Sequence, residues 1–333
     1  MAGSKQSKQK LLAIYDILYN KTDENHTVSA DDIAAELEKR GISAERKSIY
    51  KDVEELIDYG YEILYSRTGK KGWFMATREF ELPELCLLID AVQSAGFISE
   101  KKTKTLTKKL RGLTSEYLGN ELGKKVYIDS GIKCQNEEIY YNIDTLYRAI
   151  GQNLQVEFNY IRRKLGDKMT TANDVKVFTV NPYALIWSND HYYLVCNNVK
   201  YENLMHLRID RIKKVKILDT KARSFTDFTP YTIRFNSADY AKRLFNMFSG
   251  EMRNIELLCD NDLIENIIDR FGEKTPVAKY DDNAFILRAS VALSDGLVNW
   301  IMQFGEKIKI NSPPELKEMY IEKIKKIHKM YNI

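Results

Sequence analysis

Hydrophobic positions recur at helical spacing through the first 60 residues of the chain. Ser29 followed by Asp32 is a capping-box pattern and predicts a second helix that ends at Gly41. Ser43 predicts the start of a third helix almost at once, and such a tight joint is typical of a helix-turn-helix. The apolar stripes comprise Leu11, Tyr15 and Leu18 in the first helix, and Ile49, Val53 and Leu56 in the third.

Two short β-prone runs follow these helices, at residues 61–65 and 73–75, on either side of a glycine-containing turn at 68–72. They predict a β-hairpin whose tip carries lysines. Three helices and such a hairpin predict a winged helix-turn-helix over residues 1–78.

The third helix presents bases on the side away from its apolar stripe, which suits the major groove of double-stranded DNA. The alternative is an ordinary helical domain whose bases face water, and its equal content of 13 basic and 13 acidic residues supports that alternative. However, the acids fall late in helices two and three, whereas bases gather at the start of helix three, at the hairpin tip and at Lys5, Lys8 and Lys10, which favours DNA. The predicted DNA contacts are Arg46, Lys47, Ser48, Tyr50, Lys51, Lys70 and Lys71.

Helical spacing continues through residues 79–145 and predicts a helical connector, whose basic stretch at 101–111 we interpret as a solvated helix face. After residue 145 the spacing of apolar positions changes from the helical period of 3.6 residues to the strand period of two. Five or six short β-rich runs between 146 and 228, including 175–180 and 183–187 as separate strands, predict a small barrel. This block holds 14 basic and 8 acidic residues, and its arginines alternate with tyrosines, which suits a nucleotide or single-stranded nucleic acid.

Three motifs in this block carry a resemblance to a known family: 180–187 (VNPYALIW), 190–195 (DHYYLV) and 205–212 (MHLRIDRI). In this order they resemble the WYL-domain transcriptional regulators, with Tyr192 standing where that family has its tryptophan. Residues 46–53 (RKSIYKDV) are similar to the core of the family's winged helix. The resemblance implies an Sm-like or SH3-like barrel and a groove that binds an effector. Carried over by position, the effector contacts are Tyr160, Arg162, His191, Tyr193, Arg208 and Arg211.

The last third, residues 229–333, alternates strands and helices in a βαββαβ order with an extra helix, which predicts a ferredoxin-like layout. It resembles the C-terminal extension of WYL regulators, which relatives often use to form homodimers. The fold class predicted for the whole chain is therefore α+β and multidomain.

No catalytic motif is present in the sequence: neither a phosphate-binding loop, nor HExxH, nor GxSxG occurs. We therefore expect no enzyme, no catalytic residue and no cofactor. The four cysteines and four histidines lie far apart, so we expect no metal site. No apolar run is long enough for a membrane span, and we expect a cytoplasmic protein with no membrane partner.

Two functions follow from these features. The first is a homodimeric transcriptional regulator that binds double-stranded DNA and senses an anionic effector, either a nucleotide or single-stranded nucleic acid. The alternative is an accessory protein that binds RNA or single-stranded DNA through the barrel and acts on a partner such as a CRISPR effector.

Overall fold

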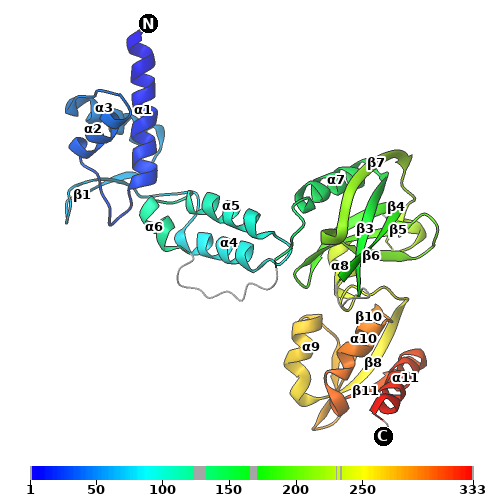
Figure 1. Cartoon of the computed structure of the whole chain (residues 1–333). Coiled ribbons are helices and arrows are strands. Elements are labelled where there is room, and N and C mark those ends of the chain that lie inside the picture. Colours follow the sequence, from blue (N-terminus) through cyan, green and yellow to red (C-terminus); the bar gives the residue numbers. More distant parts are fainter. Residues whose placement is uncertain (1, 123–132, 166–170, 230, 233–234, 332–333) are drawn as a thin grey trace. The chain divides into compact units, whose positions relative to one another are not determined.

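The computed structural model describes residues 2–122, 133–165, 171–229, 231–232 and 235–331. Its chain divides into two compact units, Met1–Gln135 and Asn136–Ile333, and each is described by itself. Helices and antiparallel sheets occur in both units (Figure 1). The mixed α and β, multidomain class predicted from the sequence is confirmed, whereas the boundaries at 78, 145 and 228 stay predictions.

The first unit begins with three helices and a two-stranded antiparallel hairpin. Helix α2 has the predicted capping box, because Ser29 Oγ accepts from the Asp32 amide (3.2 Å) and the Asp32 carboxylate accepts from the Ser29 amide (2.8 Å). The elements are α1 (Ala2–Lys21), α2 (Ala30–Lys39), α3 (Arg46–Tyr59), β1 (Ile63–Ser66) and β2 (Gly72–Met75).

The predicted start of the third helix at Ser43 is wrong, because α3 begins at Arg46. The Ile42 amide donates to the Leu37 carbonyl (2.9 Å), which closes the end of α2. Ile42 and Ala44 then pack against the core, so this segment forms the turn between the helices instead of the first turn of α3.

One core joins the three helices to the hairpin. Ile14, Ile33 and Ile49, one from each helix, are fully buried there. Trp73 of β2 pairs with Val28 through two backbone hydrogen bonds of 2.8 and 3.0 Å, which attaches the hairpin to the segment before α2. A Cβ atom at Gly72 would lie 2.4 Å from the Val28 carbonyl oxygen, so this close approach requires glycine.

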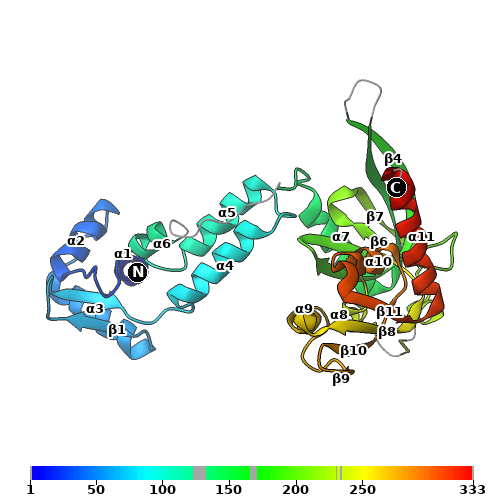
Figure 2. The same cartoon turned by 90° about the horizontal axis from the view of Figure 1, so that it is seen from below.

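Among the described residues of the first unit, three further helices follow: α4 (Leu82–Ser94), α5 (Glu100–Arg111) and α6 (Glu116–Glu121). Helices α4 and α5 lie side by side (Figures 1 and 2). Their small core is formed by Leu85, Ile89 and Leu122, against which Leu110 and Leu113 pack.

The second unit begins with α7 (Ile139–Gln152) and a five-stranded antiparallel sheet in the order β6-β5-β4-β3-β7. Residues 175–180 and 183–187 belong to one strand, so the prediction of two strands is wrong. Pro182 lies at an irregularity in the pairing with β5, where a residue without an amide hydrogen is tolerated. The strands are β3 (Leu154–Leu165), β4 (Thr171–Ser188), β5 (His191–Asn198), β6 (Leu204–Arg208) and β7 (Ile212–Lys221).

A short helix, α8 (Ser237–Lys242), precedes a four-stranded antiparallel sheet in the order β11-β8-β10-β9. Its core holds Leu257, Leu287 and Ile301 at zero exposure. The remaining elements are β8 (Met252–Asp260), α9 (Ile264–Phe271), β9 (Val277–Lys279), β10 (Ala284–Ala292), α10 (Asp295–Met302), β11 (Ile308–Ser312) and α11 (Pro314–Tyr331). Among the described residues, no helix combines the length and the apolar character needed to cross a bilayer.

Candidate nucleic-acid interface and effector site

Helix α3 exposes the lysines that the sequence predicts to contact DNA. Ile49 and Val53 of the same helix are buried, so Lys47 and Lys51 lie on the opposite, solvent-facing side. Lys51 Nζ lies 3.9 Å from Glu55 Oε1, at the limit of an ion pair, and Lys47 has no ion-pair partner among the described residues. Both ammonium groups are therefore accessible to an anionic partner.

The first turn of α3 lies beside the hairpin. Arg46 is exposed, and its pKa is raised first by a hydrogen bond with Tyr50, then by Asp31, with a smaller contribution from Tyr65 of β1. The Tyr50 ring meets Trp73 of β2 edge-on, with 4.8 Å between centroids. These contacts pack the first turn of α3 against the hairpin.

Ser48 and Lys10 contact each other inside the protein. Lys10 Nζ contacts Ser48 Oγ and lies 2.8 Å from Asp52 Oδ2, and the Lys10 and Asp52 side chains are only 13% and 9% exposed. The prediction that Lys10 is one of the DNA-facing bases is wrong, because its ammonium group forms a nearly buried ion pair with Asp52. The Ser48 hydroxyl is likewise engaged by α1.

The hairpin tip carries three exposed bases, and two of them, Lys70 and Lys71, are predicted DNA contacts. Lys70 Nζ lies 3.0 Å from Asp32 Oδ2, which ties the tip to the start of α2. Lys71 is exposed and has no ion-pair partner within the described ranges. The third, Arg67, is also exposed and was missed, although its place directly before the Thr68-Gly69 turn is a usable signal.

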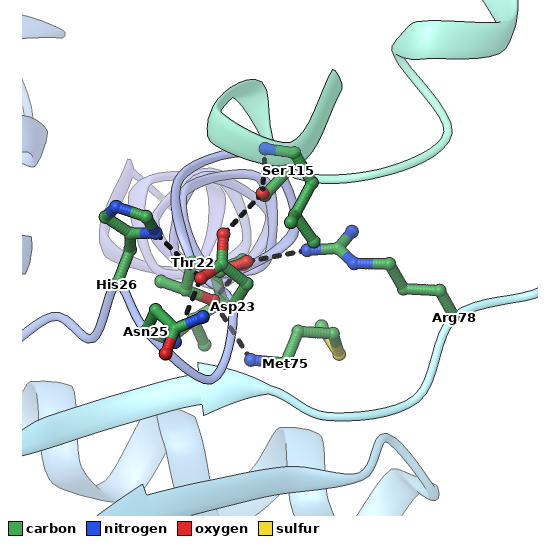
Figure 3. A network of polar contacts seen from close by, with 9 residues as sticks. Thr22, Asp23, Asn25, His26, Met75, Arg78 and Ser115 are labelled. Atoms are coloured by element: carbon green, nitrogen blue, oxygen red, sulfur yellow. Dashed lines mark hydrogen bonds and ion pairs between the residues drawn. The ribbon is translucent and has the colours of Figure 1, made fainter. Parts of the chain in front are cut away.

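A buried carboxylate joins this module to the connector helices (Figure 3). Asp23, which is 6% exposed, accepts hydrogen bonds from Ser115 Oγ (2.6 Å) at the start of α6 and from the Asn25 amide (3.0 Å). His26 Nδ1 lies 2.7 Å from Asp23 Oδ1, the oxygen that also accepts from the Asn25 amide, whereas Ser115 donates to Oδ2. Burial alone would raise the pKa of Asp23, but the hydrogen bonds from Ser115 and His26 outweigh it and lower the pKa. We call this group, together with Thr22 and Arg78, the Asp23 joint.

Thr22 connects the same joint to the end of the hairpin. Its hydroxyl accepts from the Met75 amide (3.0 Å), and its carbonyl accepts from Arg78 (2.7 Å). The His26 ring stacks on Tyr117 of α6, with 3.7 Å between centroids and 1° between planes. The end of α1, the end of β2 and the start of α6 therefore meet in one packed contact.

Five of the six candidate effector residues lie on strands β3, β5 and β6 of the five-stranded sheet, and Arg211 lies in the short 3-10 turn between β6 and β7. Tyr193 of β5 pairs in register with Arg208 of β6. Arg208 donates two hydrogen bonds to Asp210, from Nε (3.1 Å) and Nη2 (2.7 Å), so its charge is already matched by a carboxylate. Asp210 was not predicted as part of the site, although it stands between the two arginines in the sequence.

His191 belongs to the same group. Its Nδ1 atom is buried without a hydrogen-bond partner, and burial lowers its pKa, with Arg208 and Arg211 contributing in the same direction. The imidazole is therefore neutral near pH 7. Burial also raises the pKa of Tyr193, which the same two arginines oppose.

Arg162 and Arg211 are the exposed cations of the group. The Arg162 guanidinium lies over the Tyr160 ring, 5.8 Å from its centroid. Tyr160 itself is only 4% exposed and also meets Phe178 edge-on, so its ring forms part of the core. An anion that approaches this surface therefore meets Arg162 and Arg211 before the other predicted residues.

Comparison with known families identifies two parts of the chain. Residues 141–217 match the WYL domain, and residues 248–327 match the WCX domain. The chain carries both domains. The predicted WYL domain and its C-terminal extension are thereby confirmed, and the six effector candidates all lie within the WYL match.

No curated protein matches the chain. Among solved structures, it is similar to proteasome accessory factor B/C (PafBC) of Arthrobacter aurescens, with 15% sequence identity and a TM-score of 0.27. The match covers 94% of this chain and 47% of PafBC, so the chain spans about half the length of that protein. Within the described residues, no group of three or more His, Cys, Asp or Glu side chains could hold a metal ion.

Proposed function

We propose that the protein is a DNA-binding transcriptional regulator with a winged helix-turn-helix in residues 1–78. The observation that carries this proposal is the exposure of Lys47 and Lys51 on the solvent-facing side of α3, whose first turn packs beside the hairpin. In this arrangement α3 enters the major groove, where Lys47 and Lys51 contact base edges, and Arg67 and Lys71 of the hairpin contact the backbone.

The WYL domain, which we propose to be an Sm-like barrel, then serves as a sensor of an anionic effector. Arg162 and Arg211 bind the anion, because both are exposed. The charge of Arg208 is already neutralised by its ion pair with Asp210, so Arg208 contributes less to anion binding. The strand order of the WCX sheet supports a ferredoxin-like layout, through which we propose that two copies associate. The effector shifts the population of DNA-competent dimers, and no reaction is catalysed.

The test is fluorescence anisotropy with labelled duplex DNA from upstream of the protein's own gene, titrated at several salt concentrations. Lys47→Ala or Lys51→Ala should weaken binding by about 1–3 kcal/mol if the side chain reads a base, and by less if it contacts phosphate. If the side chain contacts phosphate, its loss should also reduce the salt slope by about one unit. Lys39→Ala, which removes an exposed lysine of α2 paired with Glu36, is the matched control. Equal affinity of all these variants for duplex DNA contradicts the proposal.

The proximity of Arg208 and Arg211 to Tyr193 and His191 favours a second candidate function, the binding of RNA or single-stranded DNA by an accessory protein. Arg211→Ala and Arg208→Ala separate the two functions. Loss of single-strand binding with intact duplex binding assigns single-strand recognition to the sheet. Intact single-strand binding in both variants rejects this second function.

A further inference from the structure

The first half of β4 has one edge without a strand beside it. β4 pairs with β3 along residues 171–180, whereas its pairing with β5 begins only at Val180. Residues 171–179 and the end of β3 therefore form a two-stranded arm of the sheet (Figure 2), and no described strand lies along the other side of this part of β4. An edge of about 30 Å, at about 3.4 Å per residue, is long enough for another strand to pair with it.

Backbone groups of alternate residues are directed toward this free edge. The Thr179 carbonyl accepts a hydrogen bond from the amide of Val199, which directly follows β5, so this carbonyl faces away from β3. The direction of backbone groups alternates along a strand, so Val177 and Val175 direct their amides and carbonyls to the same side. Among the described residues, no backbone hydrogen bond outside the strand pairings reaches either valine.

The side chains of this segment include apolar residues that face water. Val175 and Val177 are 53% and 66% exposed, and Ile161 of β3 lies beside Val175 in the register. Free edges are usually protected by proline, by a bulge or by charged residues. Residues 171–180 contain no proline, and their pairing with β3 has no register shift. The charges of this segment therefore decide what can pair with it.

Two opposite charges stand on either side of Val175. Asp174 precedes it and Lys176 follows it. Lys176 is exposed and has no ion-pair partner within the described ranges, whereas Asp174 lies 2.9 Å from Lys164 Nζ. If two identical β4 strands pair antiparallel about a two-fold axis at Val175, Asp174 of each copy lies directly opposite Lys176 of the other. The edge is therefore complementary in charge to itself.

We propose that two copies of this chain associate by antiparallel pairing of their β4 edges, with Val175 on the two-fold axis. Two cross-strand pairs between Asp174 and Lys176 stabilise the contact, and Ile161 and Val175 of both copies form one apolar row across it. This interface belongs to the five-stranded sheet, so it is separate from the association proposed through the WCX sheet. It does not depend on DNA binding.

Disulfide crosslinking of the full chain tests the register. In Val175→Cys the two Cα atoms lie about 5.5 Å apart across the axis, a separation that a disulfide spans. Mild oxidation and non-reducing electrophoresis should then show a covalent dimer at several times the level of the unaltered protein, whose partly exposed Cys86 and Cys134 give the background. Val177→Cys is the matched control, because its side chain is more exposed but its counterpart lies about 13 Å away along the strand. It should stay at the background level.

Charge exchange in the Val175→Cys protein tests the pairing between the copies. Asp174→Lys or Lys176→Asp places like charges opposite each other at two symmetry-related positions, so roughly tenfold more protein should be needed for the same yield of dimer. The double exchange should restore the yield, because opposite charges then face each other again. Both Asp174→Lys and the double exchange lose the ion pair with Lys164, so a recovery cannot come from that pair.

Two results would overturn the proposal. One is a covalent dimer that forms equally in Val175→Cys and Val177→Cys, or no more than in the unaltered protein. This is the outcome if the copies associate only through the WCX sheet, or if a strand of another protein covers the edge. The other is a double charge exchange that fails to restore the yield. The DNA-binding test rests on Lys47 and Lys51, so its result is independent of both.

Discussion

The sequence predicts that Lys10 faces DNA, whereas in the structure Lys10 is paired inside the first unit. Its ammonium group belongs to a nearly buried ion pair with Asp52, which links α1 to the inner side of α3. Such a pair holds two helices in register, and removing one partner leaves the other charge buried.

Asp52→Ala should therefore lower the free energy of unfolding by about 2–4 kcal/mol, measured by urea denaturation of the full chain. The double variant Lys10→Met with Asp52→Leu should recover most of this loss, because it removes both charges and keeps the packed volume. A cost below about 1 kcal/mol for Asp52→Ala would show that the pair contributes no more than a surface contact.

His206 makes the stability of the second unit depend on pH. Burial lowers its pKa from 6.5 to about 4, and its Nε2 atom lies 3.1 Å from the Tyr240 hydroxyl. The unfolded chain binds a proton at a higher pH than the folded one, so stability is complete above pH 6.5 and declines as the pH falls toward 4. The loss should reach up to about 3 kcal/mol. His206→Gln should flatten this part of a stability profile measured by denaturation, and an unchanged profile would contradict the assignment.

At the scale of elements, the hairpin depends on one glycine. Gly72→Ala places a methyl group against the Val28 carbonyl, so the bridge between Trp73 and Val28 must open. We expect a loss of about 2 kcal/mol or more in stability and weaker duplex binding, because the tip loses its fixed position beside α3. Circular dichroism melting and anisotropy measure the two effects. Gly69→Ala is the control for the turn, since its positive φ of 63° causes backbone strain without a clash against Val28.

The sequence predicted elements well where apolar spacing or a cap defines them. The capping box of α2 and the stripe of α3 are local patterns, and both are present in the structure. The start of α3 and the continuity of β4 depend instead on how Ile42 packs and how Pro182 is accommodated, which no local pattern encodes.

The residues of the candidate sites, like the helices and strands, were predictable only where a local pattern defines them. The exposure of Lys47 and Lys51 follows from helical geometry, because both lie on the side of α3 opposite the apolar stripe. The sequence alone therefore predicts that both are exposed. The roles of Asp210 and Arg67 depend on which charges are paired by contacts in the folded chain. A sequence pattern shows which residues are charged, but not which charges are already paired.

At the scale of the whole molecule, the Asp23 joint connects the module of α1–α3 and the hairpin to the connector helices within the first unit. Ser115→Ala removes the hydrogen bond that most strongly lowers the pKa of Asp23. It should lower stability by about 1–3 kcal/mol at neutral pH, measured by denaturation, because the carboxylate stays buried with one partner fewer.

The effect of Ser115→Ala should itself depend on pH. The lowered pKa of Asp23 means that its contribution is complete above the ordinary value of 3.8 and is lost as the pH falls through the folded-state value. The variant and the unaltered protein should therefore converge in stability in strong acid. A constant difference at all pH values would assign the loss to packing of the hydroxyl alone.

The same joint determines where the chain can be cut. A fragment that stops at Arg78 keeps every base of the proposed DNA-binding surface. However, Asp23 loses the hydrogen bond from Ser115, and the His26 ring loses its stacking contact with Tyr117. Cleavage after Gln135 leaves both intact. Fragments of this protein for binding assays or crystallisation should therefore end at Gln135, where the compact unit ends, and not at Arg78, where the predicted winged helix-turn-helix ends.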